Sequence, residues 1–157
     1  MKILRRKIIH DIDRSFSIVT FSHLQYPLHY HDEYELILMT SGTGREYIGH
    51  AVGKFAQWDL TLIGKGVPHV HICDSMSDPS VKTESSCEVL YFPASLFPEN
   101  MEVVEEYRPI HTLLKKSMSG IRFTDPDENR RIHADMKKIR KTTGIARVQV
   151  LLSILDK

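Results

Sequence analysis

Short β-type segments separated by turn residues fill the first part of the chain, and this pattern restricts the folds it can adopt. The segments at 45–48 and 51–55 flank Gly49-His50 and predict a hairpin. The apolar run at 34–40 ends at Ser41-Gly42-Thr43-Gly44. Several short strands at this spacing predict a β-sandwich or a closed β-barrel. The other predicted strands lie at 17–23, 60–63, 69–72 and 87–92.

After Pro98 the apolar residues recur with a helical period. Asp125-Pro126 predicts a helix start, with Asp as the N-cap and Pro at the first helical position, and Gly144 ends that helix. The final segment, 145–157, is apolar nearly all round, so it must be covered on more than one side. We infer a second copy or a following domain as its partner, and we expect the natural chain to continue past Lys157.

Composition narrows the functional classes. The 157 residues are enough for one domain with its own core, and the formal net charge of +1 gives no overall attraction to nucleic acid. No apolar stretch is long enough for a signal peptide or for a membrane span. Cys73 and Cys87 each stand alone, which favours reduced thiols in a cytoplasmic protein.

Three histidines and a glutamate have the spacing of a common site. His29, His31 and Glu35 form the pattern H-x-H-x3-E, and strand alternation can place them on one face. His69 follows a tight turn at 64–68, and His71 shares its face. Such groups are costly to bury unpaired, so they bond to one another, hold water or bind a metal. Three imidazoles and a carboxylate suit Zn, Ni, Mn or Fe.

The pattern H-x-H-x3-E-x6-G, from His29 to Gly42, resembles the first motif of the cupin family. The segment 53–69 resembles the second motif, with Trp58-Asp59 where the family often has Gly-Asp. This resemblance implies that the metal ligands are His29, His31, Glu35 and His69. The chain departs from the family at His23 and Cys73, in place of a Gly and an Asn.

A narrower resemblance covers nearly the whole chain. The runs 27–38 and 59–64, with Val67-Pro68-His69, Tyr91-Phe92-Pro93 and the closing helices, are similar to the N-terminal sensor half of AraC-type transcription regulators. The resemblance implies a mainly β fold: a cupin-type double-stranded antiparallel β-barrel (jelly roll) at 1–98, followed by an α-helical hairpin for dimerisation and linkage at 99–157. It also implies a DNA-binding helix-turn-helix half beyond the 157 residues.

The function this implies is ligand sensing and dimerisation, without catalytic residues. A small-molecule effector, a sugar or related metabolite being one candidate, would bind in the barrel, and a homodimer would form through the C-terminal helices. DNA would be bound only through the other half. The effector pocket is expected at His29, His31, Glu35, His69, Tyr47 and Trp58.

Two alternatives stay open at this point. The four ligand-type residues either hold a divalent metal or form a hydrogen-bonded cluster that lines the pocket. The chain is either a sensor domain or a stand-alone metal-dependent cupin enzyme, such as an isomerase or a dioxygenase, in which a metal would act as Lewis acid or oxygen activator.

Overall fold

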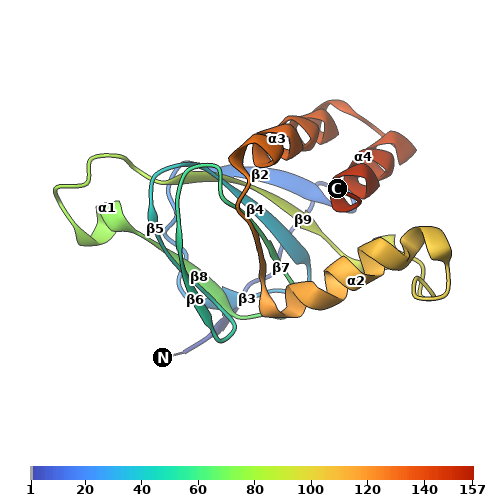
Figure 1. The fold of residues 1–157 in the computed structure, drawn as a ribbon, viewed down its shortest axis with the longest axis horizontal. Helices are drawn as coiled ribbons and strands as arrows, with labels where there is room; N and C mark the ends of the chain where they lie inside the picture. Colours follow the sequence, from blue (N-terminus) through green and yellow to red (C-terminus); the bar gives the residue numbers. More distant parts are fainter. Residues whose placement is uncertain (1) are drawn as a thin grey trace.

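The computed structural model describes residues 2–157 and has three layers: two five-stranded sheets that face each other and a layer of helices on the outer side of the second sheet (Figure 1). A hydrophobic cluster that includes Ile37, Ile48 and Val89 lies between the sheets. A larger cluster that includes Leu38, Met136 and Leu151 joins the second sheet to the helices. The predicted fold class, mainly β with C-terminal helices, is confirmed.

The first sheet, here sheet A, has no helix packed over its outer face in Figure 1. The hairpin predicted around Gly49 is present as β5 and β6, and Gly49 has the positive φ of 57° that such a turn favours. All neighbouring strands are antiparallel except β1 and β3, which are parallel. In spatial order the strands are β1 (Leu4–Arg5), β3 (His29–Tyr30), β8 (His69–Cys73), β5 (Gly44–Ile48) and β6 (Ala51–Phe55).

The second sheet, sheet B, is antiparallel throughout and has β4 at its centre. Alternate residues of β4 serve two cores: Ile37 and Met39 face sheet A, whereas Leu36 and Leu38 face the helices. This double burial explains why every residue from 36 to 39 is apolar. The spatial order is β10 (Ile121–Phe123), β7 (Leu60–Ile63), β4 (Tyr34–Ser41), β9 (Ser86–Phe92) and β2 (Ser17–Phe21).

Three helices, α2 (Arg108–Lys116), α3 (Pro126–Lys141) and α4 (Ile145–Leu155), cover sheet B (Figure 1). α3 begins as predicted, because the Asp125 side chain accepts hydrogen bonds from the backbone N–H groups of residues 127 and 128. α4 buries Leu151, Ile154 and Leu155 within the molecule but leaves Ile145 72% exposed. None of the described helices is long and apolar enough to cross a membrane.

The short elements modify the predicted division of the chain. The polar stretch after Cys73 contains one helical turn, α1 (Asp74–Ser77), and short 3-10 turns lie at Ala94–Leu96, Glu105–Tyr107 and Ser117–Ser119. Strand β10, inside the region expected to be helical, adds to sheet B next to β7, with Ile121 opposite Leu62. The segment 99–157 is therefore part of the same folded unit as the barrel, because its strand completes the sheet that its helices cover.

Candidate functional site

The four predicted ligand residues come together inside the barrel, although they lie on different elements. His29 on β3 is directly opposite His69 on β8, so pairing within sheet A sets these two side by side. Glu35 reaches them from β4 of sheet B, and His31 lies in the irregular link between β3 and β4. One ligand atom from each of the four lies within 4.8 Å of the others. All four side chains are buried.

Backbone carbonyl groups hold each of the three rings by its Nδ1 atom. His29 Nδ1 lies 2.8 Å from Pro27 O, His69 Nδ1 lies 2.8 Å from Val67 O, and His31 Nδ1 lies 3.0 Å from Glu33 O. A carbonyl only accepts hydrogen bonds, so each Nδ1 carries a hydrogen. The Nε2 atoms, all turned toward the cluster, are then left as the metal-binding nitrogens of neutral rings.

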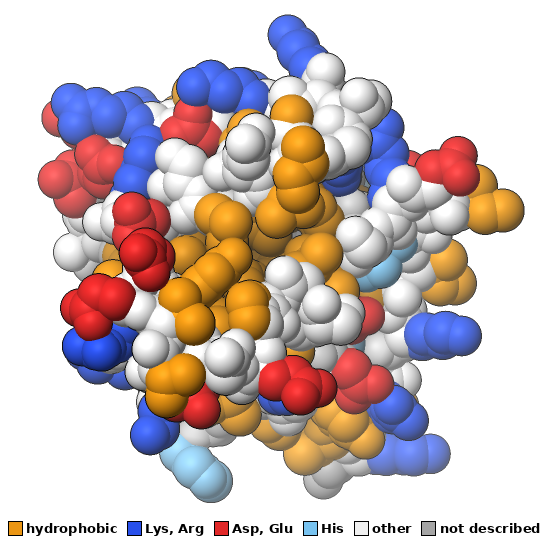
Figure 2. Space-filling model, turned by 90° about the vertical axis from the view of Figure 1, so that its right-hand side faces the viewer, with side chains coloured by type: hydrophobic (Ala, Val, Ile, Leu, Met, Phe, Trp, Pro, Cys, Tyr) orange, Lys and Arg blue, Asp and Glu red, His pale blue; other side chains and the backbone are white. Residues whose placement is uncertain are grey.

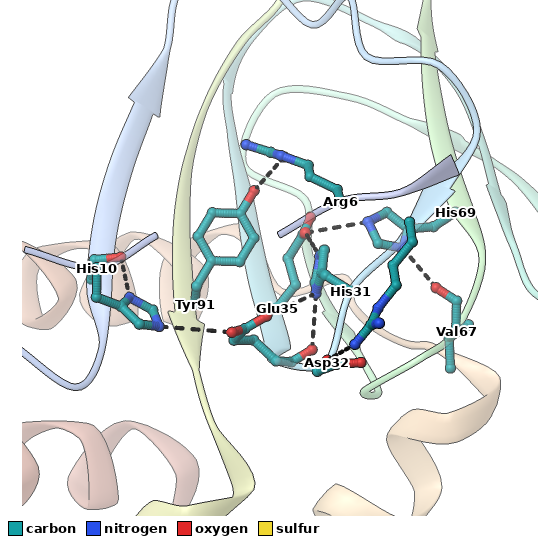
Figure 3. A network of polar contacts seen from close by, with 11 residues as sticks. Arg6, His10, His31, Asp32, Glu35, Val67, His69 and Tyr91 are labelled. Atoms are coloured by element: carbon teal, nitrogen blue, oxygen red, sulfur yellow. Dashed lines mark hydrogen bonds and ion pairs between the residues drawn. The ribbon is translucent and has the colours of Figure 1, made fainter. Parts of the chain in front are cut away.

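Glu35 is the only carboxylate of the cluster. Its Oε2 lies 2.9 Å from His31 Nε2 and 3.2 Å from His69 Nε2 (Figure 3). The contact with His69 is close but poorly aligned, and the Nε2 atoms of His29 and His69 have no hydrogen-bond partner among residues 2–157. In a neutral ring the hydrogen on Nδ1 leaves Nε2 without one, so the Nε2 atoms of His31 and His69 would face the Glu35 carboxylate as two lone pairs. A proton or a cation is therefore required between the carboxylate and these nitrogens. The donor set therefore fits a divalent metal ion.

The pKa shifts follow from burial and from these contacts. Burial and the neighbouring His69 lower the pKa of His29 to about 4, so this ring is neutral at pH 7. Burial alone would raise the pKa of Glu35, but the charge of His69 and the hydrogen bond with His31 lower it well below its ordinary range. Burial opposes a charge on His69, yet attraction to Glu35 raises the pKa of its ring. Without a metal, the cluster is thus held together as a buried ion pair.

A small cavity of about 30 Å³ adjoins the cluster. His29, Glu35 and His69 form part of its lining, with His71 beside them. This volume has room for about two water molecules, far less than the several hundred Å³ of an ordinary ligand pocket. In this conformation the barrel interior can accept a metal ion and a small group bound to it. The other lining residues are Arg6, Phe21, Leu24, Tyr26, Ile37, Cys87, Val89 and Tyr91.

Tyr47 and Trp58, the two aromatic residues expected in the pocket, are not brought to the cluster. Tyr47 alternates with buried Glu46 and Ile48 along β5, which turns it to the outer face of sheet A. Trp58 packs instead beside His133 and Arg130 of α3. It has a φ of 72°, a conformation that glycine adopts more easily, at the position where cupins often have Gly.

The sequence interpretation did not single out Arg6 and Tyr91 as cavity residues. Arg6 directly follows β1, a strand of two residues that the sequence pattern did not predict, and no spacing rule links it to the histidines. Parity along β9 could have identified Tyr91, because it is paired with Glu35 of β4. His71, predicted to share the face of His69, lines the cavity, and its Nε2 lies 3.4 Å from Glu46 Oε2.

Glu46 connects the barrel interior to strand β10. Besides its contact with His71, this buried carboxylate accepts hydrogen bonds from the Arg122 guanidinium and from the Thr61 hydroxyl. Burial alone would raise the pKa of Glu46, but His71 and Arg122 lower it below its ordinary value. A polar chain thus runs from the cavity wall to the strand that leads into α3.

Comparison with solved structures places this fold among known ones. No protein-family model matches the chain, and no curated protein sequence matches it. Apo ToxT from Vibrio cholerae strain SCE256 aligns with a TM-score of 0.56 and 7% identity, over 94% of this chain and 55% of that one. ToxT from Vibrio cholerae O395, bound to (E)-4-(8-methylnaphthalen-1-yl)but-3-enoic acid, aligns with a TM-score of 0.53 and 10% identity, over 90% and 54%.

The chain therefore spans about half the length of ToxT, and the alignment includes helices as well as the barrel. The AraC-like transcriptional activator CuxR aligns more weakly, with a TM-score of 0.47 and 11% identity, over 80% of this chain and 40% of that one. At these identities the likeness concerns the fold. The chain shares its fold with the part of ToxT that it covers.

Substitution of Glu35 tests the buried ion pair. We expect Glu35→Ala to lower the free energy of unfolding of the metal-free protein by about 3–5 kcal/mol, because it leaves buried charge without its partner. Urea unfolding after dialysis against a chelator measures this change. Glu84→Ala is the matched control, because Glu84 also faces a histidine, His23, but at the exposed surface. A loss no larger than that of the control would contradict the role given to Glu35.

Proposed function

We propose that this chain is the ligand-sensing and dimerisation half of an AraC-type transcription regulator. The proposal rests on the extent of the fold likeness to ToxT, which covers 94% of the chain. The barrel alone makes up a smaller share of the chain, so the likeness includes the C-terminal helices. ToxT structures have been solved with an unsaturated fatty acid and with a naphthyl-butenoic acid. By analogy, a small-molecule effector binds at the barrel, and DNA binding belongs to a second half of the whole protein.

The product of the complete gene should then bind promoter DNA. Chromatin immunoprecipitation of the tagged genomic product is expected to enrich a few promoters. The 157-residue chain alone, whose net charge of +1 gives no overall attraction to nucleic acid, should show no sequence-specific DNA binding in a gel-shift assay. The absence of any enriched promoter would contradict the proposal, as would tight sequence-specific binding by the 157-residue chain.

A groove between sheet B and the helices supports dimerisation. Its volume is about 540 Å³, and its lining includes Leu113 of α2, Phe123, Ile132 of α3 and Ile154 of α4. Figure 2 looks onto the side of the molecule where α2 and α4 lie and shows hydrophobic side chains gathered in a hollow at its centre. Leu113 and Phe123 are partly exposed in this groove, whereas Ile132 and Ile154 are buried. An apolar hollow that opens to solvent is typical of an association site. We assign it to a second copy of the chain.

Dimer formation can be tested by placing a charge in the groove. Leu113→Glu should shift the chain from dimer to monomer in sedimentation equilibrium, because an unpaired carboxylate is costly in an apolar interface. The control is Thr112→Glu, which adds the same charge at the neighbouring exposed position of α2. A wild-type chain that stays monomeric at every concentration would contradict the assignment, as would a Leu113→Glu dimer of wild-type affinity.

The second part of the proposal is a divalent metal held by His29, His31, Glu35 and His69. Its support is the fixed orientation of the three rings, whose Nδ1 atoms bond to carbonyl groups. The Nε2 atoms of His31 and His69 face Glu35, and one ligand atom from each of the four residues lies within 4.8 Å of the others. A bound metal would supply a Lewis-acidic centre for a donor atom of the effector. The chain's own residues orient the ligands, exclude bulk water and supply the one negative charge of the site.

Metal binding has a direct measurement. Protein purified without chelators should contain about one equivalent of a divalent metal by elemental analysis. His31→Ala should weaken Zn²⁺ binding by more than about 100-fold in calorimetry, since loss of a ligand costs at least as much as loss of its outer-shell partner. His50→Ala, in the exposed hairpin turn, should bind as the wild type does. Equal affinities for His31→Ala and the wild type would exclude this ligand set.

The same donor set favours a second candidate, a metal-dependent cupin enzyme. The small volume beside the cluster does not separate the two candidates, because an effector as well as a substrate larger than two water molecules needs a rearrangement to enter. The DNA-binding experiment above separates the candidates, since an enzyme of this kind has no reason to occupy promoters.

A further inference from the structure

A pocket at the corner where α3 passes into α4 gathers three arginines (Figure 1). Arg14 comes from the segment before β2, Arg140 from the last turn of α3 and Arg147 from the first turn of α4. The pocket has a volume of about 210 Å³, compared with about 30 Å³ beside the candidate metal site, and the two share no lining residue. The rest of its lining is Asp11, Ser17, Ile18 and Ile139.

Arg147 is a buried cation without a carboxylate partner. It is only 6% exposed, and in the part of the chain that the structure describes no Asp or Glu oxygen lies within 4 Å of its guanidinium. The guanidinium lies 4.7 Å from the centre of the Phe16 ring. Its NH1 and NH2 donate hydrogen bonds to the backbone carbonyls of Ile139 and Phe16, each at 2.8 Å. A guanidinium has five N–H donors, so these two bonds leave others for a ligand.

The positive charges around the pocket exceed the negative ones. Three arginines and one aspartate give the lining a net charge of +2. Glu88, outside the lining, lies 3.4 Å from Arg140 and reduces the excess to +1. Asp11 contributes little, because its side chain is 84% exposed and its Oδ2 lies 3.9 Å from Arg14 Nε.

The arginines also act on one another. Burial lowers the pKa of Arg147, and the positive charge of Arg14 lowers it further. The negative end of the α3 dipole, at the Ile139 carbonyl, offsets only part of the Arg147 charge. Without a ligand, the pocket therefore holds like charges close together, and a bound anion would remove this repulsion.

We propose that this pocket binds the phosphate group of a small phosphorylated molecule. A phosphate monoester carries about −1.5 to −2 charges at pH 7, which matches the excess positive charge. Guanidinium groups from three separate segments suit a group whose three terminal oxygens point in different directions, whereas a carboxylate offers two oxygens in one plane. The bound phosphate would link the segment before β2 to both helices. This inference is independent of the metal site.

The test is a calorimetric titration of the 157-residue chain at constant ionic strength, after dialysis against a chelator so that no metal ion binds the phosphate. We expect saturable binding of inorganic phosphate and of methyl phosphate. Acetate and dimethyl phosphate, which represent a carboxylate and the diester of a nucleic-acid backbone, should bind at least tenfold more weakly, because each carries one charge and fewer terminal oxygens.

Substitution of Arg14 tests the role of the cluster. In Arg14→Gln, phosphate binding should weaken about tenfold or more, because a charge-assisted hydrogen bond is lost. The Arg14 side chain is 32% exposed, so its replacement leaves the core intact, whereas Arg147→Gln also removes hydrogen bonds that join α4 to α3. The control is Arg45→Gln, which removes the same charge from an exposed position on β5 and should bind phosphate as the wild type does.

Four results would overturn the inference. These are a wild-type chain without saturable phosphate binding, equal phosphate binding by Arg14→Gln and the wild type, acetate binding as tight as that of phosphate, and dimethyl phosphate binding as tight as that of methyl phosphate. The last result, together with duplex DNA binding that Arg14→Gln abolishes, would assign the arginines to a nucleic-acid backbone instead. None of them affects the metal proposal, which rests on other residues.

Discussion

The hydrogen bonds from three imidazole Nδ1 atoms to backbone carbonyls are the constraint on which the candidate site depends. Each carbonyl belongs to a residue two positions away in sequence, at 27, 33 and 67. The local chain path therefore sets the orientation of each ring before any ligand arrives. The turn at 64–67 also donates a backbone hydrogen bond from Gly66 to His31 O at 2.7 Å, which ties the link that carries His31 to the strand that carries His69. Such preorganisation reduces the free-energy cost of binding.

Strand β4 joins this site to the rest of the molecule. It presents Glu35 to the cluster, and its next residue, Leu36, packs in the core shared with the helices. A second connection runs from His71 through Glu46 to Arg122 on β10, just before α3. A ligand that binds one arrangement of these elements better than another would increase the population of that arrangement, and the position of the helical layer would change with it. This is the physical requirement for a barrel that controls an attached domain.

The sequence was sufficient for local features. The H-x-H-x3-E spacing located His29, His31 and Glu35, the resemblance to the second cupin motif added His69, and alternation placed His71 on the face of His69. Cap chemistry fixed the start of α3 at Asp125. Residues whose positions depend on contacts between distant segments were missed or misplaced. Strand β10 is too short to show a periodicity, and Arg6 reaches the cavity only because β1 pairs in parallel with β3. Trp58 has a left-handed backbone conformation and packs against α3, about 70 residues later in the chain. Strand alternation does not reveal a contact between segments so far apart in sequence.

The most direct measurement of the central claim is an X-ray absorption spectrum of the zinc-loaded chain. If the cluster holds the metal, the first shell should fit imidazole nitrogens and a carboxylate oxygen at about 2.0–2.2 Å, with the outer-shell scattering of three histidine rings. A shell that contains sulfur at about 2.3 Å, from Cys73 or Cys87, would contradict this ligand set. A shell of oxygen alone, without ring scattering, would contradict it equally.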